Sequence, residues 1–286
     1  MNRNVLFGKM AAVLVFMTAC CMTVAAQTSG GLAPADTAAA GERRVTTSSY
    51  AVGYGPTRIL DTYLSQEHFS GGGLTFLSSV RRQRPSRRWS TVMQQQAGIS
   101  SASNRSDDAD ELEGAYDFFW GRYRSWYFAG DRLHVSVGGM VNVGAGFIYN
   151  TLNGNNPAQA RIHVNAMPSV AASWRFSLWR LPMCVGYELE LPLCGVMFSP
   201  NYGQSYYEIF SRGNYDHNIV PTTFVSAPDF RQQIMLDIGV SRKVALRVGY
   251  LGDYRQAKVN NLKLHIYSHR FMIGIVKRFS IINYRP

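Results

Sequence analysis

The sequence predicts an all-β fold, an antiparallel up-and-down transmembrane β-barrel of about ten strands. Three observations predict it: an N-terminal export signal, long segments in which apolar and polar residues alternate, and alternate loops of unequal length. From residue 133 to residue 149 every second residue is apolar or aromatic apart from one glycine, and the intervening residues are mostly small or polar. Because successive side chains of a strand point to opposite faces, this segment has one apolar face long enough to cross a membrane.

The N-terminus has the pattern of a secretory signal. Two basic residues precede an apolar run that ends in small residues, which predicts cleavage after Ala26. The run is too short for a spanning helix, although a retained anchor is the alternative. Residues 17–20 (MTAC) resemble a lipoprotein processing site without its usual leucine. We therefore expect a signal peptide at 1–26 and, because 27–45 is rich in Ala, Gly, Ser and Thr, a disordered periplasmic leader there.

The remaining chain, residues 46–286, is predicted to form the barrel. Alternation is clear in the central segments and weaker in the first two, and in the last segment its phase slips near residues 268–270. A β-bulge there would reconcile the two halves of that strand. The predicted strands are 46–54, 71–81, 89–100, 112–123, 132–149, 159–177, 183–192, 229–240, 244–257 and 262–281.

The gaps between these strands support a membrane barrel. Counted from a periplasmic N-terminus, all the periplasmic gaps are short, whereas the outward gaps include the long segment 193–228. Short periplasmic turns and longer outer loops are typical of outer-membrane barrels. Twelve strands is the alternative if 193–228 contributes a hairpin. A soluble β-sandwich would also alternate, but segments such as 159–177 exceed the usual strand of about five or six residues.

The composition favours lipid rather than nucleic acid as a partner. The formal net charge is +11, yet the chain carries an export signal and no nucleic-acid-binding module. A basic excess in such a chain favours contact with anionic headgroups or charge that lines the barrel interior. We expect localisation in the outer membrane of a Gram-negative cell. The expected partners are membrane lipids, the barrel-assembly machinery and a periplasmic or surface partner, with no nucleic acid.

Charged residues recur at positions that alternation places inside the barrel. A barrel of about ten strands is nearly filled by side chains, so arginines paired with carboxylates would plug its lumen. A narrow polar path for a small solute is the alternative. The predicted lumen charges are Arg175, Arg231, Arg247, Arg255, Glu188, Glu190, Asp237 and Asp253.

A run of five arginines occupies the first periplasmic turn and the strand ends beside it. It would serve either as a dock for periplasmic anions or a partner protein, or simply as a solvated turn near anionic headgroups. The run consists of Arg81, Arg82, Arg84, Arg87 and Arg88.

The sequence favours a protein without catalytic, metal or cofactor sites. Ser205, Glu208 and His217 supply the ingredients of a lipid hydrolase, the alternative activity, but no G-x-S-x-G motif surrounds the serine. The six histidines are scattered, so no metal site is expected. Cys184 and Cys194 are too far apart along an extended strand for a disulfide, and two free thiols are expected unless the chain bends between them.

The long gap 193–228 is the predicted binding element. It is rich in aromatic residues, which would expose a large apolar surface if the segment were mobile. We therefore expect an ordered segment that either closes the lumen as a lid or presents a recognition surface. The predicted binding residues are Tyr202, Gln204, Tyr206, Tyr207 and Glu208.

Two segments, 60–65 (LDTYLS) and 198–209 (FSPNYGQSYYEI), resemble signatures of an uncharacterised family of Bacteroidetes-type outer-membrane β-barrel proteins. With the strands, the resemblance covers residues 46–286 and implies the fold and the location, but no activity. Barrels usually end on an aromatic residue that the assembly machinery recognises, whereas this chain ends on Pro286. Phe279 or Tyr284 would then serve as the recognised residue. The sequence thus predicts a non-catalytic structural or surface-binding barrel with a largely plugged lumen, with a narrow small-solute transporter as the alternative.

Overall fold

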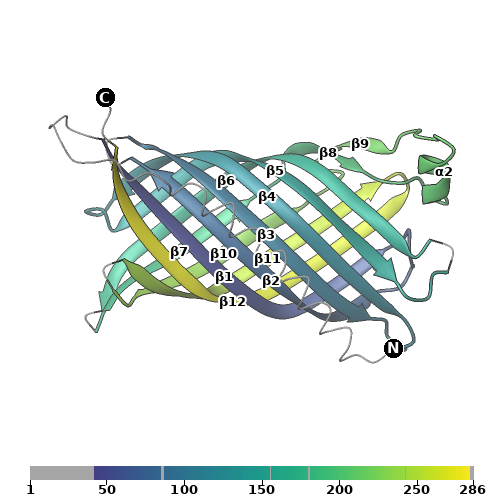
Figure 1. Cartoon of the computed structure of the whole chain (residues 1–286), viewed down its shortest axis with the longest axis horizontal. Helices are drawn as coiled ribbons and strands as arrows, with labels where there is room; N and C mark the ends of the chain where they lie inside the picture. Colours follow the sequence, from purple (N-terminus) through teal and green to yellow (C-terminus); the bar gives the residue numbers. More distant parts are fainter. Residues whose placement is uncertain (1–41, 85–86, 155, 180, 242, 284–286) are drawn as a thin grey trace.

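In the computed structural model the chain forms a closed β-barrel (Figure 1). The structure describes residues 42–84, 87–154, 156–179, 181–241 and 243–283. Ten antiparallel strands close the barrel in the order β1–β2–β3–β4–β5–β6–β7–β10–β11–β12, and β12 pairs back onto β1. The predicted fold class is confirmed. Within the described residues there is no helix with the length and apolar character needed to span a bilayer.

The elements are β1 (Glu42–Asp61), β2 (Phe69–Gln83), β3 (Trp89–Ser103), β4 (Asp110–Phe128), β5 (Leu133–Asn150), β6 (Ala158–Leu178), β7 (Leu181–Glu190), β8 (Cys194–Phe198), α2 (Tyr206–Phe210), β9 (Ile219–Thr223), β10 (Phe230–Gly239), β11 (Val244–Val259) and β12 (Leu262–Asn283).

Each of the ten predicted segments coincides with a barrel strand. The largest difference is β1, which begins at Glu42, inside the range expected for the leader, and extends to Asp61 because both β12 and β2 pair along most of its length. The predicted signal peptide and residues 27–41 of the leader lie outside the described residues.

The bulge expected in the last strand is absent, so that prediction was wrong. The register of β12 against β11 is continuous through residues 268–270, where Leu251 pairs with Arg270 and Tyr250 with Phe271. The apparent slip of phase arises because the inner face of the strand changes from apolar to charged: Leu262 and Ile266 are buried apolar residues, and the same face further along carries the buried Arg270. Its guanidinium donates to the hydroxyl of Thr57 (2.6 Å) and to a backbone carbonyl (Pro56 O, 2.8 Å).

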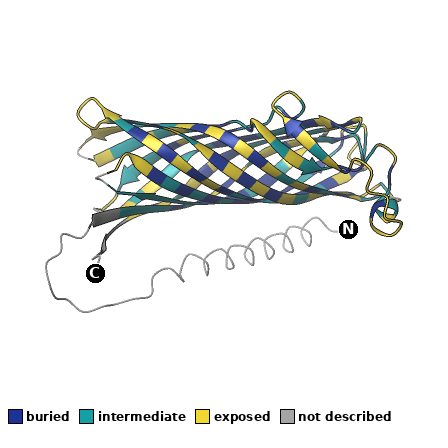
Figure 2. Ribbon diagram, turned by 90° about the horizontal axis from the view of Figure 1, so that it is seen from above, coloured by how far each residue is buried: buried dark blue, intermediate teal, exposed yellow. Residues whose placement is uncertain are grey.

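Burial alternates along the strands, as the chequered pattern in Figure 2 shows. On β5 the side chains of Val137, Val141 and Val143 are exposed on the outer wall, whereas those of His134 and Asn142 are buried in the lumen. A closed barrel with an apolar outer wall and a polar interior is the arrangement expected in a bilayer, where every backbone group must be paired within the protein.

The long gap contains the hairpin that the twelve-strand alternative required, but the hairpin does not widen the barrel. The strand β8 pairs with β6 at residues 163–166, directly beyond the part of β6 that pairs with β7. The strand β9 pairs only with β8 among the described residues. The hairpin therefore lengthens the wall above β7 and β10, and it carries α2 at one end of the barrel (Figure 1). We call this the cap end, and the opposite end, with the short connections, the turn end.

Candidate functional site

The segment that joins β8 to β9 is organised around the short helix α2. Ser205 is its N-cap residue, and the Ser205 hydroxyl accepts a hydrogen bond from the backbone N–H of Glu208 (3.2 Å). The Glu208 carboxylate accepts one from the backbone N–H of Ser205 (2.8 Å), which completes a capping box. The hydrogen bonds that Ser205 donates to this carboxylate, from its backbone N–H and then from its hydroxyl, lower the pKa of Glu208 below its ordinary value. The serine and the glutamate thus determine where the helix begins.

Gln204 holds the two ends of this segment together. Its side-chain oxygen accepts hydrogen bonds from the backbone N–H of Asn201 (3.0 Å) and from the amide of Asn218 (2.8 Å). Its side-chain nitrogen donates to the carbonyl of Asn214 (3.0 Å). Because Gln204 is buried, each of these bonds would be costly to lose.

Two tyrosines attach this segment to the barrel. The hydroxyl of Tyr63 donates to the carbonyl of Gln204 (2.9 Å), and the hydroxyl of Tyr206 accepts from the backbone N–H of Ala160 on β6 (2.7 Å). The two rings pack edge to face with centroids 5.9 Å apart. Burial raises the pKa of Tyr206 to about 12. The segments 60–65 and 198–209, which the sequence singled out separately, are therefore in contact, and we call residues 61–65 with 198–218 the cap.

The cap leaves several aromatic side chains exposed. Tyr202, Tyr207 and Phe210 are 67%, 64% and 63% exposed, and the guanidinium of Arg212 lies 5.6 Å from the centre of the Tyr207 ring. Of the five predicted binding residues, Tyr202 and Tyr207 thus face solvent. The other three, Gln204, Tyr206 and Glu208, make the internal contacts that hold the cap in place.

The residues considered for lipid hydrolysis do not form a catalytic arrangement in this structure. The Ser205 hydroxyl donates to the Glu208 carboxylate (3.1 Å), while the exposed His217 contacts the carboxylate of Asp216. No hydrogen bond joins Ser205 to His217, both of which are among the described residues.

Most of the predicted lumen charges are paired inside the barrel. Arg231 contacts Glu190 in an ion pair in which both side chains are almost fully buried. Asp237 accepts two hydrogen bonds from Arg247 (2.6 and 2.8 Å). Arg255 lies 2.8 Å from Asp253.

The two other predicted lumen charges, Glu188 and Arg175, make no ion pair with another described residue, and their surroundings differ. Glu188 accepts hydrogen bonds from Gln94 (3.2 Å) and from the hydroxyl of Tyr123 (3.0 Å). Arg175 is exposed at the turn end.

The lumen also contains charged residues that the sequence analysis missed. Asp117 lies 2.6 Å from Arg255 and 3.1 Å from His163, so it links β4 to β6 and to β11 across the barrel. Arg161 pairs with Glu113 (2.8 Å), and both are buried. The sequence did contain a signal for Asp117 and Glu113, namely the alternation along β4, whose odd-numbered residues face inward.

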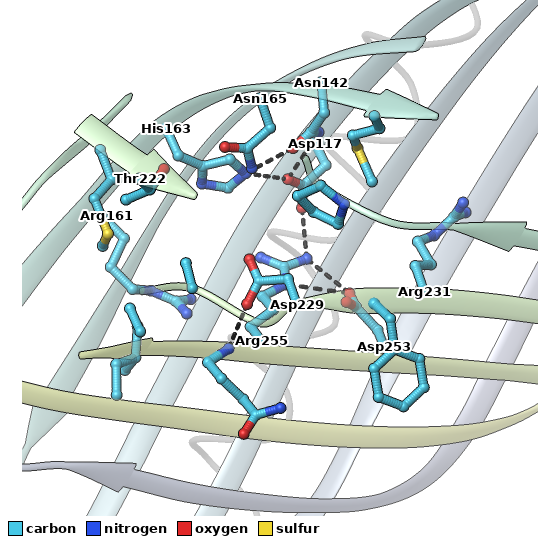
Figure 3. Close-up of a pocket in the computed structure, with 18 of the residues that line it drawn as sticks. Asp117, Asn142, Arg161, His163, Asn165, Thr222, Asp229, Arg231, Asp253 and Arg255 are labelled. Atoms are coloured by element: carbon cyan, nitrogen blue, oxygen red, sulfur yellow. Dashed lines mark hydrogen bonds and ion pairs between the residues drawn. The ribbon is translucent and has the colours of Figure 1, made fainter. Parts of the chain in front are cut away.

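Four of these side chains, those of Asp117, Arg161, His163 and Arg255, line a cavity of about 70 Å³ in the half of the lumen nearer the cap (Figure 3). Asp117, His163 and Arg255 project into it from three strands, and Asp229 projects from the connection between β9 and β10. Asp229 also accepts a hydrogen bond from the backbone N–H of Gln256. Since a water molecule occupies about 30 Å³ in the liquid, the cavity has room for a few water molecules or one small polar molecule.

No group of three His, Cys, Asp or Glu side chains in the described part of the chain could hold a metal ion. Cys184 and Cys194 are free thiols. His265 and His269 contact tyrosine hydroxyls, with Tyr267 beside the first and Tyr250 beside the second.

Comparison with known proteins identifies the family. A family model described as "Protein of unknown function (DUF3316)" matches residues 12–286. The chain belongs to this family. The resemblance noted in the sequence is thus confirmed at the level of an uncharacterised family, and the Bacteroidetes-type assignment of this DUF3316 protein stays a prediction. None of the curated proteins matches its sequence significantly.

Solved structures similar to the DUF3316 chain are outer-membrane barrels. The translocator domain of the autotransporter NalP from Neisseria meningitidis is 12% identical over 95% of this chain and 98% of its own, with a TM-score of 0.38. The outer membrane protease OmpT from Escherichia coli is 6% identical over 84% and 97%, with a TM-score of 0.47. An outer membrane channel from Pseudomonas putida F1 is 9% identical over 87% and 100%, with a TM-score of 0.33. Sequence identities and TM-scores this low support no argument about activity.

Proposed function

We propose that this DUF3316 protein is an outer-membrane barrel with a closed lumen that displays the cap as a binding surface. The observation that carries the proposal is the construction of the cap. Gln204, Tyr206 and Glu208 are used for internal contacts, and this framework holds Tyr202 and Tyr207 exposed above the barrel. Tyrosine and arginine, with tryptophan, are enriched at the energetic centres of protein interfaces, and Arg212 lies against Tyr207.

A location in the outer membrane is supported by the outer wall. Apolar side chains such as Val141 and Ile162 are exposed along strands far longer than a bilayer crossing requires. Trp89 and Trp174 are exposed nearer the turn end, where a ring of aromatic residues would meet the headgroups. With the export signal, these features favour insertion with the cap outside the cell. Assembly would then require the barrel-assembly machinery.

A closed lumen is supported by side-chain bonds that cross it. Arg255 of β11 binds Asp117 of β4, and Arg231 of β10 donates to Gln96 of β3 (2.8 Å). Both contacts join opposite walls of the barrel. Such a network would have to be broken before a solute larger than a few water molecules could pass.

Site-specific photocrosslinking in intact cells tests the binding function. A benzoylphenylalanine at position 207 is expected to give a discrete adduct with a surface partner, because Tyr207 lies in the proposed contact. The matched control is position 152, since Leu152 is similarly exposed in another cap-end loop. The hydrogen bonds of Gln204 to Asn201, Asn214 and Asn218 form a clasp between the two ends of the cap segment, and Gln204→Ala, which removes it, should weaken the adduct. Identical adducts at 207 and 152, or none at 207, would refute a recognition surface.

The second candidate function is a narrow path for a small polar solute. The cavity beside Asp117 and Arg255 favours it, because it is lined by charged groups of both signs. In that case the lumen network would open, and the protein would conduct ions in a planar bilayer. A lipid-hydrolysing activity through Ser205 is the third and weakest candidate, and retention of any such activity by Ser205→Ala would exclude that serine as the nucleophile.

A further inference from the structure

At the turn end, arginines from β2 and β4 project from the outer wall of the barrel. Tyr123 and Ser125 of β4 are fully buried in the lumen, so alternation places Arg122 and Arg124 on the outside, where both are exposed. On β2 the guanidinium of Arg81 lies over the lumen-facing Tyr123 ring. The next residue, Arg82, therefore faces outward.

The register of the sheet brings two of these arginines into one row. Thr91 of β3 is the Cα partner of Arg82 on one side and of Arg122 on the other. Because neighbouring strands are about 4.8 Å apart, the two arginine Cα atoms are separated by about 10 Å, with the threonine between them. Two guanidinium groups and one hydroxyl can thus converge on a single anion above Thr91.

Tryptophans place this row at the level of the lipid headgroups. The guanidinium of Arg122 lies 5.5 Å from the centre of the Trp89 ring, and that of Arg124 lies 5.5 Å from the Trp126 ring. Tryptophan rings of membrane proteins gather at the interface between headgroups and acyl chains. A guanidinium stacked on such a ring is therefore at the depth of the phosphate groups.

The three arginines need an anion from outside the protein. None of these three residues, Arg82, Arg122 and Arg124, makes an ion pair with any other described residue. An unpaired arginine on a lipid-facing surface is costly, and a phosphate oxygen pair matches its two parallel N–H donors.

Beside the row, the outer wall lacks a side chain at one position, and we call this gap the notch. The partner of Arg122 on β5 is Gly139, which is exposed on the outer wall. A Cβ atom at Gly139 would meet nothing closer than the carbonyl of Met167 at 3.9 Å. The absence of a side chain leaves room for the glycerol and upper acyl chain of a lipid directly next to the arginine.

We propose that Arg82, Thr91 and Arg122, with Arg124 beside them, bind the phosphodiester of an anionic phospholipid from the inner leaflet. The inference rests on the membrane location proposed above. It assigns a ligand to Arg82, an outward-facing member of the basic run in the sequence, and the ligand is a lipid rather than free phosphate.

The test is native mass spectrometry of the purified full-length protein in detergent, titrated with phosphatidylglycerol or with phosphatidylcholine. The wild type is expected to retain phosphatidylglycerol more tightly. Each basic residue near an anionic surface contributes on the order of 1 kcal/mol, so Arg122→Gln should weaken binding about fivefold and Arg82→Gln with Arg122→Gln about 25-fold. Gly139→Val keeps every charge but fills the notch, and it should also weaken binding.

The matched control is Arg132→Gln with Lys243→Gln, which removes two exposed charges from the turn end outside the row. It should leave phosphatidylglycerol affinity unchanged. Equal affinity for the two lipids, an equal loss in the control, or displacement of the lipid by millimolar inorganic phosphate would each overturn the proposal. Retention of the folded band in unheated SDS gels shows that every variant is intact. Cell fractionation tests the membrane location separately, so the two proposals can fail independently.

Discussion

The lumen and the cap both depend on buried polar side chains, but the two regions use them differently. In the lumen, oppositely charged side chains pair with each other, either between neighbouring strands, as Arg231 and Glu190 do, or across the barrel, as Arg255 and Asp117 do. In the cap, Gln204 and Tyr206 bind mainly backbone groups, and aromatic rings remain exposed. The difference supports the proposal that side chains in the interior close the barrel and that a partner binds at its rim.

The largest effect is expected from breaking the buried pair in the lumen. Arg231→Ala leaves the Glu190 carboxylate buried without a counter-ion, which should cost about 3–5 kcal/mol. The free energy of unfolding by urea in detergent measures the loss. Arg247→Ala is the control, because the Arg247–Asp237 pair is partly exposed and should cost less. An equal or smaller loss for Arg231→Ala would show that the lumen network does not stabilise the barrel.

A smaller effect is expected from crowding the same network. A Cβ atom at Gly144 would overlap the carboxylate of Asp117 and the ring of His163. Gly144→Ala should therefore destabilise the barrel by about 1–3 kcal/mol, whereas Gly139→Ala, on the open outer wall, should not. Unfolding midpoints of the two variants provide the measurement, and equal midpoints would contradict the packing described for the lumen.

The sequence predicted the barrel far better than the lumen network. Ten strands and eight lumen charges follow from alternation, which is a local property of each strand. Asp117 was missed because β4 carries Phe119 on its inner face and Arg122 on its outer face, and this mixture hides the phase of the strand. Its partner Arg255 is separated from it by 138 positions, and no local pattern indicates such a pair.

For the cap too, the sequence predicted the separate segments but not the contacts between them. Both of its segments were recognised in the sequence, and the aromatic content of 193–228 predicted order. The contact of Tyr63 with Gln204 depends on barrel closure, which brings the end of β1 next to the segment before α2. The sequence also could not indicate that three of the five predicted binding residues serve as internal supports.

The cap should loosen without the barrel when its clasp is removed. Gln204→Ala leaves the amides of Asn201 and Asn218 without their shared acceptor, so the cap should be cleaved rapidly by protease on whole cells. Tyr63→Phe, which removes one hydrogen bond worth about 1 kcal/mol, should have a weaker effect. Mass spectrometry of the fragments locates the cuts. Cleavage of the wild-type cap at the same rate as Gln204→Ala would show that the clasp does not order it.

The smallest effect concerns acid. The folded pKa of Glu208 is lowered by its hydrogen bonds to Ser205, so its contribution to capping is present above its ordinary pKa of 4.5 and is lost as the pH falls through the lowered value. Hydrogen exchange of residues 205–211, corrected for intrinsic rates, should accelerate below pH 4.5. In Glu208→Gln that acceleration should disappear, and its persistence would assign the acid response to another group.

Single-channel conductance in a planar bilayer tests the central claim of a closed barrel most directly. With Asp117 bound to Arg255 and Arg231 bound to Gln96 across the lumen, the wild-type protein should give no stable openings of porin size. Asp117→Ala combined with Arg255→Ala should produce small openings, because the double variant lacks one of the two side-chain contacts that cross the lumen. Large, long-lived openings of the wild-type protein would contradict the account.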